Sequence, residues 1–192
     1  MYNHLNGKLI EKNPTHLIIE CGGIGFLTQI SLFTFEHLND EESQKILLHH
    51  QITEDAQTFW GFATEQERTI FRLLISVSGV GCNTARMMLS GMNPDEIAEC
   101  IASSQIARLK SIKGIGEKTA QRLVVELKDK VSKVNSGTTL LNTGSKTRDE
   151  ACTALVMLGF NKASVDKIID QLIKSEASLT TEELIKRALK SL

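Results

Sequence analysis

Two Gly-x-Gly segments in this chain have the residues needed to bind an anion through backbone amides. "SVSGVGCNTARMML" starts at Ser76 and "SIKGIGEKTAQRLV" starts at Ser111, so one offset of 35 residues aligns them. Two glycines one residue apart allow a turn with positive φ and leave no Cβ between the backbone and a ligand. We expect a helix directly after each turn, so that its unpaired N–H groups and positive dipole end point to the same place. Each segment therefore predicts an anion-binding turn.

The two copies agree at five positions and are conservative at two more. A single Gly-x-Gly is usually only a turn, but a double copy in matched helical context favours a functional pair. The apolar residue between the glycines can fill the core. The matched pairs are Ser76 with Ser111, Val77 with Ile112, Gly79 with Gly114, Val80 with Ile115, Gly81 with Gly116, Thr84 with Thr119 and Ala85 with Ala120.

The spacing does not fit the known nucleotide-binding loops. A phosphate-binding P-loop needs Gly, four residues and then Gly-Lys-Ser/Thr, but Glu117 separates Gly116 from Lys118 and position 111 is Ser. The dinucleotide fingerprint needs a third Gly where Thr84 and Thr119 stand, and a preceding strand where a helix is expected. What remains is helix, hairpin, helix, occurring twice. Two such hairpins could grip the phosphates of both strands of a duplex without reading its sequence.

The basic residues are distributed unevenly, both along the chain and between the hairpins. Lys118 and Arg122 lie four apart on one helical face, whereas the first copy has Asn83 and Met87 there. The net charge is -1, but Lys and Arg outnumber Asp and Glu 11 to 8 in residues 64–133, against 3 to 8 in residues 1–63. This modest basicity permits a polyanionic partner and is equally typical of a solvated surface.

Composition excludes several classes of protein. The four cysteines are scattered, with no C-x-x-C pair, which is typical of reduced thiols in a cytosolic protein. The N-terminus has no apolar run of signal-peptide length, and no stretch approaches a membrane span. We therefore expect a soluble, cytoplasmic protein without a metal or a cofactor. The single Trp and single Tyr argue against large stacking platforms for unpaired bases.

The first third of the chain reads as strands. Five short runs with partial alternation are separated by turn residues: "GKLIEK", "HLIIEC", "GFLTQIS", "KILLHHQIT" and "AQTFWGF". Five strands in about 60 residues favour a small barrel, for which the five-stranded OB-fold is the natural candidate. A small sandwich is the alternative.

The middle of the chain reads as helices. Thr64 with Glu67 has capping-box spacing, and a helix should follow to about Val77. Asn93 should cap the next helix, with Pro94 at its first position. Further helices are expected at about 105–111 and 118–130, so each Gly-x-Gly lies between two helices.

A linker and a third domain complete the chain. Residues 134–147 are rich in Ser, Thr, Gly and Asn and predict a linker. Three helical patterns follow. The first is expected to end at Gly159 as its C-cap, and the third opens with Thr180 and Glu183 in capping-box spacing. The expected core of this three-helix domain is Leu155, Leu158, Ile169, Leu172, Leu184, Ile185 and Leu189.

Taken in order, seven segments resemble the RuvA family, the Holliday-junction-binding subunits of bacterial RuvA-RuvB branch-migration complexes. The resemblance covers the whole chain and rests on "LNGKLIEK", "CGGIGF", "TEDAQTFWGF", "ERTIFRLLISVSGVG", "LSGM", "KGIGEKTAQRLVVELKDK" and "EACTALVMLGF". It implies an α+β multidomain chain. The implied parts are an OB-fold domain at 1–63, a tandem helix-hairpin-helix domain at 64–133, a flexible linker at 134–146 and a UBA-like three-helix domain at 147–192.

The resemblance also implies a function and its partners. A family member is a non-catalytic subunit that holds a four-way junction open and flat and recruits the hexameric RuvB ATPase through its third domain. It acts in homologous recombination and DNA repair, including the SOS response to DNA damage. The implied assembly is a homotetramer, with one or two tetramers on the junction, joined by the RuvC resolvase in a larger complex. No cofactor is implied.

The family's functional positions map onto individual residues of this chain. The phosphate-gripping positions are Gly79, Val80, Gly81 and Asn83 in the first motif, and Gly114, Ile115, Gly116, Lys118, Thr119 and Arg122 in the second. The family's acidic pin maps to Glu54 and Asp55, at the expected tip of a hairpin. In a four-fold assembly these carboxylates would converge and repel phosphates at the crossover. A plain solvated turn is the alternative for such a pair.

One departure from the family pattern concerns charge. Members commonly carry a lysine just after the first hairpin, but this chain has Cys82 and Asn83, and in the second hairpin Glu117 precedes Lys118. We therefore expect the first hairpin to act mainly through backbone amides and the second to supply more of the salt-dependent affinity.

Two other classes of function stay open. A helix-hairpin-helix nuclease or glycosylase would need a nucleophile, a carboxylate cluster or a base pocket, and the sequence shows no such constellation. Adjacent His49 and His50 would point to opposite faces of a strand, and Glu54 with Asp55 alone would bind a metal only weakly. A protein-interaction adaptor is the other alternative, suggested by the three-helix domain.

Overall fold

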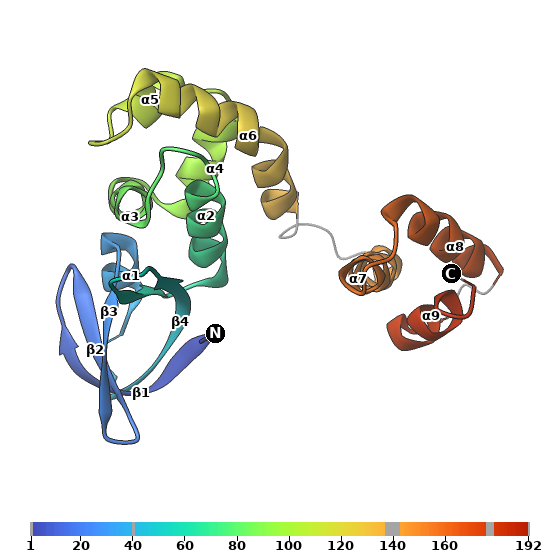
Figure 1. Ribbon diagram of the computed structural model, residues 1–192, viewed down its shortest axis with the longest axis horizontal. Coiled ribbons are helices and arrows are strands. Elements are labelled where there is room, and N and C mark those ends of the chain that lie inside the picture. Colours follow the sequence, from blue (N-terminus) through green and yellow to red (C-terminus); the bar gives the residue numbers. More distant parts are fainter. Residues whose placement is uncertain (1, 40, 137–142, 176–178, 192) are drawn as a thin grey trace. The chain divides into compact units, whose positions relative to one another are not determined.

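The computed structural model describes residues 2–39, 41–136, 143–175 and 179–191. The chain divides into two compact units, Met1–Thr139 and Leu140–Leu192, and each is treated by itself. In the first unit a barrel of strands lies at one end and a set of helices at the other (Figure 1).

The strands close into a five-stranded barrel, as the sequence predicted, and the sandwich alternative is wrong. The strand order is β1-β2-β3-β5-β4, with β1 paired to β4 to complete the ring. All neighbours are antiparallel except β3 and β5, which are parallel at Thr28 and Phe59. The strands are β1 (His4–Lys12), β2 (His16–Cys21), β3 (Ile24–Gln29), β4 (Ser43–Ile52) and β5 (Gln57–Phe62).

Alternating strand residues fill the barrel with aliphatic side chains. Successive residues of a strand point to opposite faces, so every second side chain turns inward. Leu17 and Ile19 of β2 and Ile46 and Leu48 of β4 are fully buried for this reason. Gly61 of β5 must lack a side chain, because a Cβ there would lie 2.5 Å from Cγ2 of Thr28.

A short helix that the sequence reading did not foresee lies between β3 and β4. Helix α1 (Leu32–His37) begins after Ser31, whose hydroxyl oxygen accepts a hydrogen bond from the Thr34 N–H at 3.0 Å. The six-residue segment is too short to show a helical period, so its pattern carried no signal. Its first residue, Leu32, donates its N–H to the Ser90 hydroxyl at 3.1 Å and thereby joins α1 to the helical part of the unit.

Five helices make up the rest of the first unit and share one apolar core. They are α2 (Glu65–Ile75), α3 (Cys82–Gly91), α4 (Pro94–Ala102), α5 (Ile106–Lys110) and α6 (Glu117–Ser136). The core includes Ile70, Phe71 and Leu74 of α2 and is joined by Trp60 and Phe62 of the barrel. The barrel and the helices therefore pack directly against each other and are not separate domains joined only by a linker.

One of the two predicted capping arrangements in this region is complete, and the other needs correction. Asn93 and Glu96 form a full capping box, with Pro94 at the start of α4 as predicted. Thr64 accepts a hydrogen bond from the Glu67 N–H, as a cap should. The Glu67 carboxylate, however, does not return to Thr64, because it is buried against other partners.

Glu67 joins α2 to α1 and the barrel. Its Oε1 accepts a hydrogen bond from the Ser31 hydroxyl at 2.5 Å, and its Oε2 accepts one from the Thr34 hydroxyl at 2.7 Å and one from the Ala63 N–H at 3.2 Å. Burial raises the pKa of the Glu67 carboxyl above its ordinary 4.5, although these hydrogen bonds and the charge of His37 oppose the rise. The fold therefore favours the protonated form.

Two arginines reinforce the same boundary between barrel and helices. Arg68 of α2 donates to the Asn3 carbonyl oxygen at 2.9 Å and to the Asn3 side-chain oxygen at 2.6 Å. Arg86 of α3 donates to the Gln29 side-chain oxygen at 2.9 Å and lies over the Trp60 ring. Hydrogen bonds to a charged donor are among the stronger ones, so these contacts fix α2 and α3 against the strands.

The second unit contains the three helices that were expected. They are α7 (Thr143–Met157), α8 (Lys162–Ser175) and α9 (Thr181–Ala188). Gly159 ends α7 with φ 98°, and the Phe160 N–H donates back to the Leu155 carbonyl, as in a Schellman cap. Thr180 and Glu183 form a full capping box at α9. These two signals were confirmed.

Two residues of the predicted core of this unit are in fact exposed. Leu155, Ile169 and Leu184 are buried and Leu172 and Ile185 pack against them, as predicted. Leu158 is 62% exposed and Leu189 is 44% exposed, so their assignment to the core was wrong. Leu158 directly follows the last residue of α7, and Leu189 is the C-cap of α9.

The linker predicted at 134–146 overlaps the ends of two helices. Helix α6 continues to Ser136 and α7 begins at Thr143, so helical backbone covers both of its ends. The remaining residues, 137–142, lie outside the described part of the chain.

Membrane-spanning helices and metal-binding clusters are both absent from the part of the chain that the structure describes. No helix there combines the length and the apolar character needed to cross a membrane. No group of three or more His, Cys, Asp or Glu side chains there is arranged to hold a metal ion.

The Glu67 network predicts a specific pH dependence of stability. Folding raises the pKa of the Glu67 carboxyl, so this group stabilises the folded state most at a pH below its unfolded pKa. That contribution is lost as pH rises through its pKa in the folded protein. We expect the free energy of unfolding of the natural chain, relative to Glu67→Gln, to fall as pH rises from about 4.5 towards neutrality. Urea titrations followed by the single Trp, Trp60, report on the first unit. The exposed Glu36→Gln is the control, and the same pH trend in both variants would contradict the assignment.

Candidate nucleic-acid interface

The two Gly-x-Gly hairpins have nearly the same backbone. The Val80 N–H donates to the Val77 carbonyl at 3.0 Å, and the Ile115 N–H donates to the Ile112 carbonyl at 3.1 Å. The first glycine of each hairpin has a positive φ, 92° at Gly79 and 94° at Gly114. Residues with a Cβ are strained in this region, so glycine is required there for the turn itself. The repeat seen in the sequence is thus a repeat in structure.

Each hairpin is anchored on both sides by the same contacts. The Ser76 hydroxyl donates to the Leu73 carbonyl and the Ser111 hydroxyl donates to the Arg108 carbonyl, both at 2.7 Å, where the preceding helix ends. The residue between the glycines, Val80 or Ile115, buries its side chain in the helical core. The middle residue therefore presents only its backbone to a ligand.

The helix after each hairpin starts with unpaired donors. Gly81 is the N-cap of α3 and Gly116 immediately precedes α6, and neither position can supply a side-chain cap. The first intrahelical bonds are made by the Ala85 N–H to Gly81 and the Ala120 N–H to Gly116, both at 2.9 Å. The earlier N–H groups, those of Asn83 and Thr119 among them, have no acceptor within their helices. Together with the helix dipole they suit an anion such as a phosphate.

The two hairpins also lie against each other. A Cβ built on Gly79 would lie 3.7 Å from Oγ1 of Thr119, and one built on Gly114 would lie 3.8 Å from Cγ2 of Thr84. Each threonine belongs to the helix that follows the other hairpin, so the contact is reciprocal. The shared threonines are visible in the sequence, but their contact with the opposite hairpin is not, because only the fold brings the two copies together. Both anion-binding turns therefore belong to one surface.

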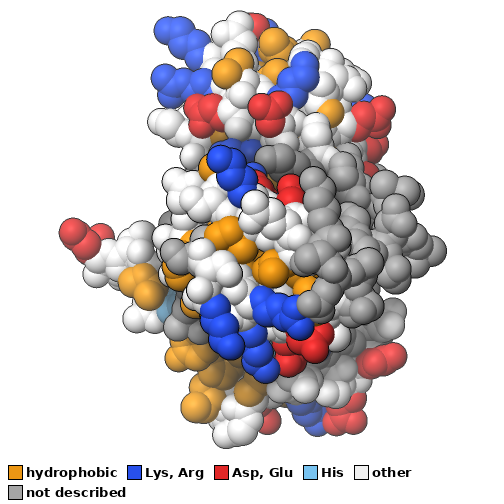
Figure 2. All heavy atoms as spheres, turned by 90° about the vertical axis from the view of Figure 1, so that its right-hand side faces the viewer, with side chains coloured by type: hydrophobic (Ala, Val, Ile, Leu, Met, Phe, Trp, Pro, Cys, Tyr) orange, Lys and Arg blue, Asp and Glu red, His pale blue; other side chains and the backbone are white. Residues whose placement is uncertain are grey.

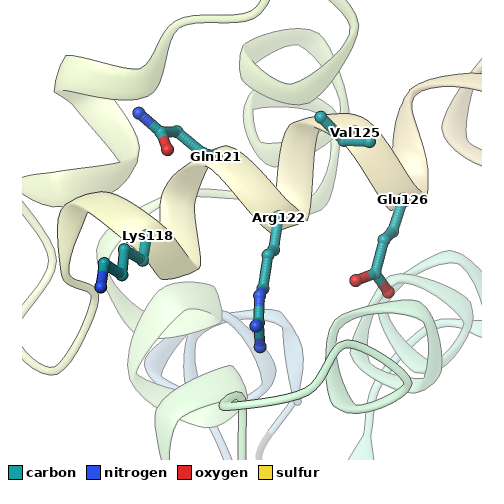
Figure 3. A pocket seen from close by; sticks show the side chains of 5 residues that line it. All are labelled: Lys118, Gln121, Arg122, Val125 and Glu126. Atoms are coloured by element: carbon teal, nitrogen blue, oxygen red, sulfur yellow. The ribbon is translucent and has the colours of Figure 1, made fainter.

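The second hairpin carries exposed positive charge. Lys118, Arg122 and Glu126 extend to one side of α6, with Gln121 and Val125 on the adjoining side (Figure 3). These five residues line a shallow pocket of about 280 Å³. Neither Lys118 nor Arg122 has an ion-pair partner among the described residues. Their charges are therefore available to a phosphate.

Glu117 and Lys113 modify this charge, and the sequence reading had missed Lys113. The Glu117 carboxylate pairs with Lys110 and also accepts a hydrogen bond from the Gln121 side chain at 3.4 Å. It is thus partly neutralised at the start of α6. Lys113 is exposed directly before Gly114. Its position in "KGIG" was the available signal, since a lysine beside the turn can reach the same anion.

The first hairpin is neutral by comparison. Asn83 is exposed and Cys82 is half-buried against the helical core. Burial raises the pKa of the Cys82 thiol, so this side chain stays uncharged at neutral pH. After the first hairpin this chain therefore has a packing residue and an amide, and no charged side chain, at positions 82 and 83.

Glu54 and Asp55 form the tip of the β4–β5 hairpin. The Thr53 N–H donates to the Ala56 carbonyl at 2.9 Å, which closes a tight turn with only these two residues at its end. Both carboxylates are exposed, and neither forms an ion pair within the described residues. The structure thus places two negative charges on a projecting tip, well separated in sequence from the hairpins.

Charges of both signs are mixed on the molecular surface. On the face drawn in Figure 2, Lys and Arg side chains are interspersed with Asp and Glu rather than gathered into one large field. This agrees with the net charge of -1. With so small a net charge, anion binding depends on local geometry and local charge.

Comparisons with known proteins match the whole chain. Family models match residues 1–61 (RuvA N terminal domain), residues 71–129 (SAM-like helix-hairpin-helix tandem) and residues 146–192 (RuvA, C-terminal domain). The chain is 50% identical to a "Holliday junction branch migration complex subunit RuvA" from Christiangramia forsetii, over 100% of both chains. Proteins of the same name from Flavobacterium psychrophilum and Bacteroides thetaiotaomicron are 42% and 40% identical, again over 100% of both chains.

The hairpin geometry predicts that the two glycines of each motif differ in their effect on stability. Gly79→Ala or Gly114→Ala should destabilise the first unit by roughly 1–2 kcal/mol, because alanine is strained at positive φ. Gly81→Asn should change stability by only a few tenths of a kcal/mol, because φ is -86° there and asparagine is a good N-cap. Urea titration followed by Trp60 fluorescence measures both effects. An equal loss at both glycines would refute the distinction.

Proposed function

Because the chain belongs to the RuvA family, we propose that it binds Holliday-junction DNA as the non-catalytic subunit of a branch-migration complex. The observation that carries this proposal is the pair of reciprocal hairpins, each with a glycine at positive φ and a helix start behind it. The full-length relatives are named for the junction and for branch migration, and their likeness extends over the whole of this chain.

The paired hairpins would grip the DNA by its backbone. Backbone amides at Gly81 and Gly116 and the helix starts behind them each bind one phosphate, and two neighbouring turns reach the two strands of one duplex arm. Because no base edge is contacted, binding would be independent of sequence. A subunit that follows a moving junction needs this property, since every base pair passes through it in turn.

The second hairpin would supply more of the electrostatic affinity. Lys118 and Arg122 are exposed and unpaired among the described residues, whereas the first hairpin has the neutral Cys82 and Asn83. Each cation that neutralises a phosphate releases a counterion and makes the affinity more dependent on salt. The salt dependence would therefore map mainly to α6.

The acidic tip would act by repulsion. Glu54 and Asp55 project from a tight turn, and neither has an ion-pair partner in the described part of the chain. In a homotetramer, the tips of four subunits would meet near the symmetry axis, where DNA strands cross. Carboxylates facing phosphates at short range would then separate the strands and direct them into different arms.

The second unit would couple the junction to its motor. Three consecutive apolar side chains are exposed where α7 ends: Val156, Met157 and Leu158. Met157 is 84% exposed and Leu158 is 62% exposed. Apolar residues that are left out of a core suit a protein partner. We assign this surface to the RuvB ATPase, which would supply the energy for branch migration, with RuvC joining the larger complex. One or two homotetramers would hold each junction, in the cytoplasm.

The DNA-binding proposal predicts a preference for four-way junctions and a salt effect that maps to α6. The purified chain should bind a junction more tightly than a linear duplex of the same sequence. Lys118→Gln with Arg122→Gln should flatten the slope of log affinity against log salt by roughly 1.8, or about 0.9 for each lost phosphate contact. Fluorescence anisotropy between 50 and 200 mM salt, roughly, gives the slopes.

Lys128→Gln is the matched control, because Lys128 lies on the same helix but contacts Ser104 instead of lining the α6 pocket. An unchanged slope in the double variant would remove these residues from the interface. Cutting of the junction by the chain alone in the presence of Mg²⁺ would contradict the non-catalytic assignment.

The coupling proposal predicts that junction binding and motor stimulation can be separated. Deleting residues 146–192 should spare junction binding, because the first unit is compact without them, and should abolish stimulation of RuvB. In the full chain, Met157→Gln with Leu158→Gln should have the same effect, since both side chains are exposed. Junction-dependent ATP hydrolysis by RuvB measures the stimulation. Thr153→Gln, another exposed position on α7, is the control. Loss of both activities in the deletion would refute the modular picture.

A further inference from the structure

A pocket between β4 and the end of α2 has no role in the proposal so far. It has a volume of about 510 Å³ and is lined by His49, Arg72, Ile75 and Ser76. His49 comes from the barrel, while the other three residues form the last turn of α2 and its C-cap. The two parts of the first unit therefore build the pocket together.

The polar groups of this pocket are positive or can become so. Arg72 is exposed and makes only one long contact, from its guanidinium to the Leu48 carbonyl at 3.4 Å. No carboxylate lines the pocket, and Arg72 has no ion-pair partner among the described residues. The Ser76 hydroxyl already donates to the Leu73 carbonyl, which leaves Arg72 and His49 as the donors. Such a set suits an anion.

The pocket is formed by the strand that leads to the acidic tip and by the helix that leads to the first hairpin. Along β4 and its turn, Glu54 follows His49 by five residues, a span of roughly 17 Å in an extended chain. On the other side, Ser76 opens the repeated segment and precedes Gly79 by three residues. A strand that passes from the acidic tip to the first hairpin would therefore cross this pocket.

We propose that the pocket of His49 and Arg72 is a third phosphate site, which binds a backbone phosphate of the DNA strand between the acidic tip and the first hairpin. This inference rests on the proposed junction binding and deepens it. It also accounts for the lack of a cation after the first hairpin, where Cys82 and Asn83 are neutral. Arg72 supplies a positive charge about one helical turn before Ser76, where the first repeated segment begins. The guanidinium would form charge-assisted hydrogen bonds with the phosphate oxygens.

Protonation of His49 would be coupled to phosphate binding. In the free protein, burial lowers the pKa of His49, and the charges of Arg72 and His50 lower it further. The ring also packs against Phe71, with ring centroids 5.5 Å apart, and this contact adds no charge. A bound phosphate would stabilise the charged imidazolium form of His49, so the ring would take up a proton when the phosphate binds. Affinity should then rise as pH falls, by up to about tenfold per pH unit between the free and bound pKa values.

The test measures junction affinity against salt and against pH in the full-length chain. Arg72→Gln should flatten the salt slope by roughly 0.7 to 0.9, the value for one lost phosphate contact, and Arg72→Lys should restore most of it. His49→Gln should remove the rise in affinity as pH falls below neutrality, while leaving the salt slope at neutral pH unchanged. Lys128→Gln should change neither quantity.

The outcomes separate this inference from the function on which it rests. If Arg72→Gln keeps the full slope while the Lys118 and Arg122 variants lose theirs, the pocket is not a phosphate site and junction binding still stands. If the natural chain does not prefer a junction, the function itself fails. An equal loss in Arg72→Gln and Arg72→Lys, with an unfolding midpoint below that of the natural chain, would show a structural role for Arg72 and overturn the inference.

Discussion

The buried carboxylate of Glu67 is the contact on which the arrangement of the site depends. Ser31 and Thr34 hold it from the α1 side, and the Ala63 N–H holds it from the end of the barrel. A buried carboxylate is costly unless it is hydrogen-bonded, so these partners select one position for the start of α2. Because α2 ends at the first hairpin, the same contact sets where that hairpin stands relative to the barrel and its acidic tip.

The helical part adds an internal symmetry to this frame. Thr84 and Thr119 reach across to the opposite hairpin, so the two turns support each other through their first glycines. The backbone of the two turns is nearly the same, but their side chains differ in charge. The first turn offers neutral amides, while α6 supplies the exposed charge of Lys118 and Arg122. In the proposed function, the first copy would mainly position the DNA and the second would supply most of the electrostatic affinity.

The distribution of charge suits a protein that must hold DNA without holding it still. In the proposed complex, the exposed carboxylates of the acidic tip would oppose DNA where the strands cross. Contacts confined to phosphates have the same energy for every sequence. Both features allow a junction to move through the complex at little cost in free energy, provided that a motor drives it.

The sequence alone determined the local features of this protein. Strand alternation, the capping pairs at Asn93 and Thr180 and the C-cap at Gly159 each act within a few residues, so their signals survive without the fold. The Gly-x-Gly repeat and the family resemblance came from the sequence as well. Tertiary structure decided what long-range contacts control. The Glu67 carboxylate binds Ser31 instead of capping its own helix. Leu158 and Leu189 are exposed, and Thr84 lies beside Gly114 of the other hairpin. Such outcomes depend on which segments pack together, and no periodicity along the chain encodes that.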